Sequence, residues 1–110
     1  MSVAAGMETV AFRMILNAGQ AEEYRRRHDG IWPELVAALK TAGVSNYRIF
    51  LDPQTHHLFA ILERTHDHRM DDLPRQEIVR RWWACMADIM QTHADNAPVI
   101  VPLEPMFHLP

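Results

Sequence analysis

Tyr24 and His28 are the residues of this chain whose types and spacing best suit proton-transfer chemistry. They stand four residues apart in AEEYRRRHDGIWPEL, a segment predicted to be helical, so the phenol and the imidazole project from one helix face. Imidazole changes its charge near neutral pH, which makes His28 a candidate general acid or base. The competing interpretation is a histidine with a purely structural role.

Three more aromatic residues are candidates for the walls of a binding site: Tyr47, Trp82 and Trp83. Tyr47 lies in a predicted strand, and its hydroxyl, like that of Tyr24, could hydrogen-bond a substrate hydroxyl. Trp82 and Trp83 are adjacent in a predicted helix, so their side chains diverge by about 100°. Such a pair suits a pocket rim that contacts the apolar faces of a sugar. The alternative is an amphipathic position at the edge of the core for Tyr47, and packing in the core or in a dimer contact for the two tryptophans.

Seven histidines raise the question of a metal site, but their spacing does not support one. His56 and His57 are adjacent on or beside a predicted strand, where side chains point apart, and His66 and His68 lie in a polar loop. The sequence has no HExxH motif and no zinc-type Cys/His spacing. It also lacks a Gly-rich phosphate loop and a nucleophile elbow. We therefore expect no metal, no nucleotide cofactor and no covalent hydrolytic intermediate.

The length of 110 residues fits one domain, with residues 1–8 as a flexible tail and 9–110 as the folded domain. A domain of this size leaves little room for a deep private cavity, so we expect a second copy to complete the pocket in a twofold dimer. The net charge is −3 and no basic stripe alternates with aromatics, which argues against a nucleic-acid partner. The basic run at residues 25–27 follows Glu22 and Glu23, which predicts a solvated helix face with i,i+4 ion pairs.

Cys85 is the single cysteine, so no intrachain disulfide can form, and this fits a reducing cytoplasm. We expect it to be a small buried residue of a helix. The chain has no run of about 18 apolar residues that could span a membrane, and its N-terminus does not resemble a signal peptide. The expected location is cytoplasmic.

The order of predicted elements is β-α-β-β-α-β, which is typical of the ferredoxin-like split βαβ fold of the α+β class. Asn17 and Gln20 form a weak capping box for the first helix, and alternation in the second strand places Tyr47 and Val44 on opposite faces. Helices would cover one face of the antiparallel sheet and a partner's sheet the other.

The predicted strands are 10–16, 44–51, 57–63, 98–101 and 104–108, with the last two at sheet edges because of their prolines. The predicted helices are 17–29, 33–41, a short one in 65–73, and 74–91.

Several short strings, in this order, resemble the L-rhamnose mutarotase family: EEYRRRHDGIWPEL, NYRIFLD…LFAILE, RRWW, DNAPV and FHLP. The resemblance runs from about Val10 to Pro110. It implies a dimeric α/β-barrel type assembly of ferredoxin-like protomers that interconverts the α and β anomers of L-rhamnose without a cofactor. It also implies that His28 is the proton donor, that Tyr24 and Tyr47 contact the sugar, and that Trp82 and Trp83 are the family's tryptophan pair. Asp29-Gly30 stands where Asn-Pro is common, and His108 where tyrosine is usual.

The residues are compatible with this chemistry, since anomer exchange requires only proton transfers. The ring oxygen gains a proton, the anomeric hydroxyl loses one, and the open aldehyde rotates before reclosure. His28 would supply the proton, while water or a second polar group acts as base. The alternatives are a mutarotase for L-fucose or another 6-deoxy hexose, a ferredoxin-like monooxygenase or haem-binding protein, and a non-catalytic sugar-binding module.

Overall fold

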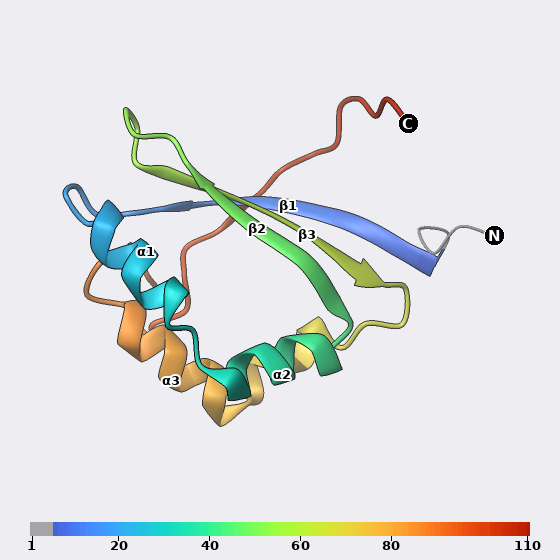
Figure 1. The fold of residues 1–110 in the computed structure, drawn as a ribbon, viewed down its shortest axis with the longest axis horizontal. Coiled ribbons are helices and arrows are strands. Elements are labelled where there is room, and N and C mark those ends of the chain that lie inside the picture. Colours follow the sequence, from blue (N-terminus) through green and yellow to red (C-terminus); the bar gives the residue numbers. More distant parts are fainter. Residues whose placement is uncertain (1–5) are drawn as a thin grey trace.

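The computed structural model describes residues 6–110, which form a four-stranded antiparallel sheet with helices across one of its faces (Figure 1). None of the described helices is long and apolar enough to cross a membrane. The strands are β1 (Met7–Ile15), β2 (Val44–Leu51), β3 (His57–Thr65) and β4 (Val101–Pro102); the α-helices are α1 (Ala21–Asp29), α2 (Pro33–Thr41) and α3 (Glu77–Met86); and η2 (Met70–Arg75) is a 3₁₀ helix.

The sheet has the order β2-β3-β1-β4, and every neighbouring pair is antiparallel. Since β3 lies between β1 and β2, these two strands run parallel to one another and are joined through α1 and α2. This is the arrangement of a split βαβ unit, so the predicted α+β class and antiparallel sheet are confirmed.

The core lies between the sheet and the helices. Alternate residues of β3 point into it, and Leu58, Ala60 and Leu62 are almost completely buried. Burying a leucine of this kind contributes about 2 kcal/mol. One buried cluster joins β1 and β3 to Tyr24 and the end of α3, and a second joins α2, η2 and α3. Trp82 packs against both clusters, so its indole connects the two halves of the core.

A β-bulge in β2 changes which side chains face the helices. Ser45 pairs with Glu63 while Arg48 pairs with Ile61, so β2 holds one extra residue between these positions. Asn46 lies in this irregular stretch with φ of +48°, a conformation that asparagine tolerates better than most residues. Val44 is consequently buried and lines the same cavity as Tyr47. The prediction that strict alternation would place these two residues on opposite faces is wrong.

Two predicted helices start later or end earlier than expected. Helix α1 begins at Ala21, and the Asn17 side chain donates to the Asp88 carbonyl oxygen instead of capping the helix. The helix predicted over 74–91 is limited to α3, because Pro74 belongs to η2 and the chain after Met86 turns back to the sheet. There the backbone N–H of Gln91 donates to the Ile15 carbonyl, which extends the pairing of β1.

The chain ends also differ from expectation. Strand β1 begins at Met7, inside the segment predicted as a tail of residues 1–8, of which 1–5 lie outside the described residues. The strand expected near 98–101 is the two-residue β4 at the sheet edge, where its prolines predicted it. No strand forms at 104–108; that stretch is exposed and leaves the sheet as an extended segment (Figure 1).

Cys85 is exposed rather than buried. It precedes the buried Met86 by one residue, which rotates it by about 100° from the inward side of α3. The prediction of a buried thiol is therefore wrong.

Candidate active site

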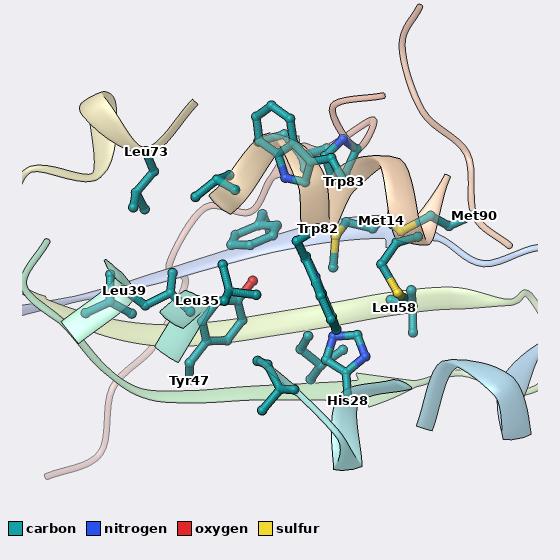
Figure 2. A pocket seen from close by; sticks show the side chains of 18 of the residues that line it. Met14, His28, Leu35, Leu39, Tyr47, Leu58, Leu73, Trp82, Trp83 and Met90 are labelled. Carbon is teal, nitrogen blue, oxygen red and sulfur yellow. The ribbon is translucent and has the colours of Figure 1, made fainter. Parts of the chain in front are cut away.

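A cavity of about 950 Å³ lies between the sheet and the three helices (Figure 2). Its walls are mostly apolar, with a few polar side chains from α1 and β2. All five residues that the sequence singled out line this cavity: Tyr24, His28, Tyr47, Trp82 and Trp83. The structure thus brings together residues from one strand and two helices that are far apart in the chain.

His28 stands in the last turn of α1 and stacks on Tyr24, with ring centroids 4.2 Å apart and an angle of 24° between the rings. Its Nδ1 lies 3.0 Å from the backbone carbonyl oxygen of Tyr24. A carbonyl oxygen can only accept, so Nδ1 carries a proton and donates it in this contact. The nitrogen that can exchange a proton with a ligand is therefore Nε2.

Burial lowers the pKa of His28 below its ordinary value, because the charged imidazolium is less well solvated in the cavity wall. The hydrogen bond to the Tyr24 carbonyl and the nearby charge of Asp29 oppose this shift but are weaker. The resting imidazole is therefore neutral at neutral pH.

Trp82 meets His28 edge to face, with ring centroids 5.3 Å apart and an interplanar angle of 88°. Trp32, which precedes α2, packs on Trp82 in the same manner at 5.1 Å. Figure 2 shows the Trp82 ring reaching the imidazole, while Trp83 lies farther from it. Trp82 packs against both core clusters, so its indole is a firmly held wall of the cavity beside His28.

Tyr47 projects into the cavity from β2, whereas His28 enters it from α1 (Figure 2). Its residue surface is 38% exposed, yet burial of the hydroxyl raises the pKa of Tyr47 to about 12, since the exposed surface is largely cavity wall. Tyr24 is buried, and burial, with a smaller effect from Tyr47, raises its pKa as well. Both phenols therefore stay protonated at neutral pH and can hydrogen-bond but not act as bases.

Two further side chains of the cavity wall, Phe12 and Met14, come from β1. Phe12 lies 6.4 Å from Tyr47, ring centroid to centroid, and Met14 follows on the same face of β1. The period-two pattern of β1 was the signal that could have assigned both to the cavity side. Asp29 is the only acidic side chain among the lining residues that the structure describes. Within residues 6–110 no group of three or more His, Cys, Asp or Glu side chains could hold a metal ion.

Comparison with known proteins gives a consistent result. A family model described as L-rhamnose mutarotase matches residues 9–109. The chain is 62% identical over 103 residues to the L-rhamnose mutarotase of Paraburkholderia xenovorans strain LB400, covering 94% of this chain and 96% of that one. It is 61% identical over 104 residues to the Burkholderia ambifaria strain MC40-6 enzyme of the same name, covering 94% and 100%. A crystal structure of L-rhamnose mutarotase from Formosa agariphila superposes with a TM-score of 0.88 at 48% identity, covering 94% and 99%.

The fold, the aromatic cavity with its imidazole, and these relatives define the class of the protein, a small α+β isomerase. Within that class the match extends over nearly the whole chain and is well above the identity at which fold alone is shared. The chain belongs to the L-rhamnose mutarotase family.

Proposed function

We propose that this protein interconverts the α and β anomers of L-rhamnose and that His28 donates the proton to the ring oxygen. The observation that carries the assignment of His28 is its geometry. Its Nδ1 is tied to the Tyr24 carbonyl oxygen, which leaves Nε2 as the one imidazole nitrogen available to a ligand in the cavity.

The reaction needs two proton movements and no redox step. Nε2–H of protonated His28 gives its proton to the ring oxygen while the anomeric hydroxyl loses one, and the C1–ring oxygen bond breaks to give the aldehyde. Rotation about C1–C2 and attack of the freed hydroxyl on the other carbonyl face close the ring. The attacking hydroxyl gives its proton back to His28, and the carbonyl oxygen regains the proton that the base took. Water or a second polar group takes the anomeric proton, and Asp29 is the acidic side chain that lines the cavity.

The remaining predicted residues have binding roles in this proposal. The protonated hydroxyls of Tyr24 and Tyr47, both of which line the cavity, hydrogen-bond sugar hydroxyls. Trp82 and Trp83 contact the apolar C–H faces of the sugar or its 6-methyl group. A mostly apolar cavity also strengthens the electrostatic effect of each polar group, because little water competes with it.

We further propose that two copies form a dimer through the sheet face that the helices leave open. Arg13 lies on that face, between Phe59 of β3 and Val101 of β4. Its Nε is buried and has no hydrogen-bond partner among the described residues, which is costly for a cationic group. Phe50 on the same face is 55% exposed. A second copy would cover the aromatic surface and supply an acceptor to Arg13.

Anomer exchange measured by saturation-transfer NMR on L-rhamnose tests the proposed function. Wild-type protein should accelerate exchange at a pH where the spontaneous rate is slow. The variant His28→Gln should lose about 10²–10⁴ of that acceleration. His93→Gln is the matched control, because His93 is exposed and its side chain does not line the cavity.

Wild-type exchange at the rate of free sugar would refute the activity, and full activity in His28→Gln would refute the role of His28. Running L-fucose in parallel distinguishes the substrate from its nearest 6-deoxy alternative.

A further inference from the structure

Helix α1 carries Tyr24 and His28 but has weak means of its own to hold them in place. It has only nine residues, and Gln20 at its N-terminus makes no side-chain capping hydrogen bond. Tyr24 is its single buried residue. Isolated helices of this length are not stable in water, so the orientation of α1 must be fixed by contacts with the rest of the fold.

Arg27 supplies the strongest such contacts. Its Nη1 donates to the carbonyl oxygen of Cys85 at 2.6 Å and to Asp88 Oδ1 at 2.7 Å, and its Nη2 donates to Asp88 Oδ2 at 3.2 Å. Its Nε donates to Glu23 Oε2 at 2.7 Å within α1. The side chain is only 18% exposed, and a fork-like pair of charge-assisted hydrogen bonds has a defined geometry.

Asp88 holds both ends of the segment that carries the helix. Its carboxylate accepts from Arg27 in the last turn of α1, while its backbone carbonyl accepts from the Asn17 side chain before the helix, at 3.3 Å. The Asn17 backbone N–H donates to the next carbonyl, that of Ile89, at 2.9 Å. These hydrogen bonds join α1 and the residue before it to the segment that follows α3. We call this set of contacts the brace.

The brace connects the two helices whose rings meet in the site. Arg27 directly precedes His28, and Cys85 follows Trp82 by three residues, about one turn of α3. The edge-to-face contact of His28 with Trp82 spans the same pair of helices. A change in the distance between α1 and α3 at Arg27 would thus move the imidazole relative to the indole.

We propose that Arg27 is a positioning residue for the reaction, which holds His28 and Tyr24 against Trp82 through its bonds to Asp88 and Cys85. Arg27 does not line the cavity and acts only through the placement of α1. This inference depends on the proposed function for its kinetic readout.

The variants Arg27→Gln and Asp88→Asn test the brace from its two sides. Each should lower kcat per folded molecule by about tenfold or more, because small misplacements of a reacting group are costly, with a smaller change in KM. The double variant should be little worse than either single one, since both remove the same contact. Arg27→Lys keeps the charge but not the fork, and should recover only part of the rate.

Arg26→Gln is the matched control. Arg26 is the neighbouring arginine. It also pairs with Glu23, but unlike Arg27 it makes no hydrogen bond or ion pair to a residue of α3 or to Asp88 within the described chain. It should keep wild-type kinetics. NMR titration of the His28 ring is the readout that general destabilisation would not move. In Arg27→Gln the pKa of His28 should rise toward its ordinary value as the ring becomes less buried.

Wild-type kcat and an unchanged His28 titration in Arg27→Gln would overturn the proposal. A lower melting temperature with normal kcat per folded molecule would also overturn it, since the brace would then be purely structural. If the wild-type protein does not accelerate L-rhamnose exchange, the proposed function fails. The His28 titration still decides the role of Arg27 in that case.

Discussion

The proposed proton donor, His28, is held by one hydrogen bond and by stacking on a neighbouring ring. Nδ1 of His28 donates to the carbonyl oxygen of Tyr24, four residues earlier, and the imidazole stacks on the Tyr24 ring. Both contacts follow from the i,i+4 spacing in a helix. They fix the tautomer, so Nε2 is the nitrogen free to exchange a proton, however a ligand binds.

The rate should depend on pH through this residue. Burial lowers the pKa of His28, so the imidazole is neutral at neutral pH and must gain a proton at Nε2 before it can donate one. We therefore expect kcat/KM to rise as the pH falls from about 8 and to level off below the pKa of His28, which lies below about 6.5. The measurement is exchange of L-rhamnose anomers with the uncatalysed rate subtracted at each pH.

The control for this profile is His28→Gln, which should show no such step. A rate that falls with decreasing pH would contradict the proton-donor role and indicate that the neutral imidazole works as a base.

The stability of the fold must be measured over the same pH range. Because the pKa of His28 is lowered, the unfolded state binds the proton more readily, so this group's contribution to stability is full above about pH 6.5 and is lost as the pH falls to the lower pKa of the folded state.

At the residue scale the sequence predicted which side chains meet, but not how. The four-residue spacing of Tyr24 and His28 predicted a shared face, and they are stacked. The contact of His28 with Trp82 depends on how α1 packs on α3, which no local pattern encodes. For the same reason the sequence predicts a solvated face for residues 25–27, whereas the Arg27 guanidinium reaches across to Asp88.

At the scale of elements, the junction between α2 and β2 sets the position of Tyr47. Gly43 makes this junction with φ of +96°, a conformation that residues with a Cβ rarely adopt. A Cβ on Gly43 would also overlap Thr65 Oγ1 at the end of β3. The junction therefore requires glycine for two independent reasons, and β2 starts from it.

Gly43→Ala should destabilise the protein by about 2 kcal/mol or more, from the left-handed backbone together with the overlap at Thr65. Equilibrium urea unfolding at one protein concentration measures this. Gly30→Ala is the matched control, because Gly30 has φ of −100° and its nearest neighbours would lie at 3.8 Å, an ordinary contact distance. It should change the free energy of unfolding by less than about 0.5 kcal/mol. Equal losses in the two variants would contradict this account of Gly43.

Elements bounded by clear start and stop residues were predicted with the correct first and last residues, and the others were not. Pro33 and Gly43 delimit α2, and β2 follows at once, so both elements match their predictions. Asn17 and Pro74 are equally good start signals by local rules. They failed because the segments beside them bond to other parts of the fold, Asn17 to the chain after α3 and Gln91 to β1. The bulge in β2 left no clear local signal except the asparagine that it contains.

At the scale of the whole molecule, one face of the sheet and the C-terminal segment are not packed against any other part of the described chain. The helices lie on one side only, and the segment beyond β4 leaves the sheet (Figure 1). Its apolar side chains are strongly exposed, with Met106 at 88% and Phe107 at 85%. Large apolar side chains exposed in this way, here and at Phe50 on the open sheet face, are typical of a surface that another chain covers. We infer that both are covered in the proposed dimer.

Light scattering coupled to size exclusion tests the dimer directly. Wild-type protein at micromolar concentration should have twice the chain mass of 12.7 kDa. Phe50→Asp should give a folded monomer, because Phe50 is already 55% exposed in a single subunit, so a carboxylate there costs little folding energy but opposes sheet-to-sheet contact. Ala37→Asp introduces the same charge at an exposed position of α2 and should stay dimeric.

A wild-type monomer, or equal dissociation in both variants, would show that the open face is not the interface. The unpaired Nε of Arg13 would then need another acceptor.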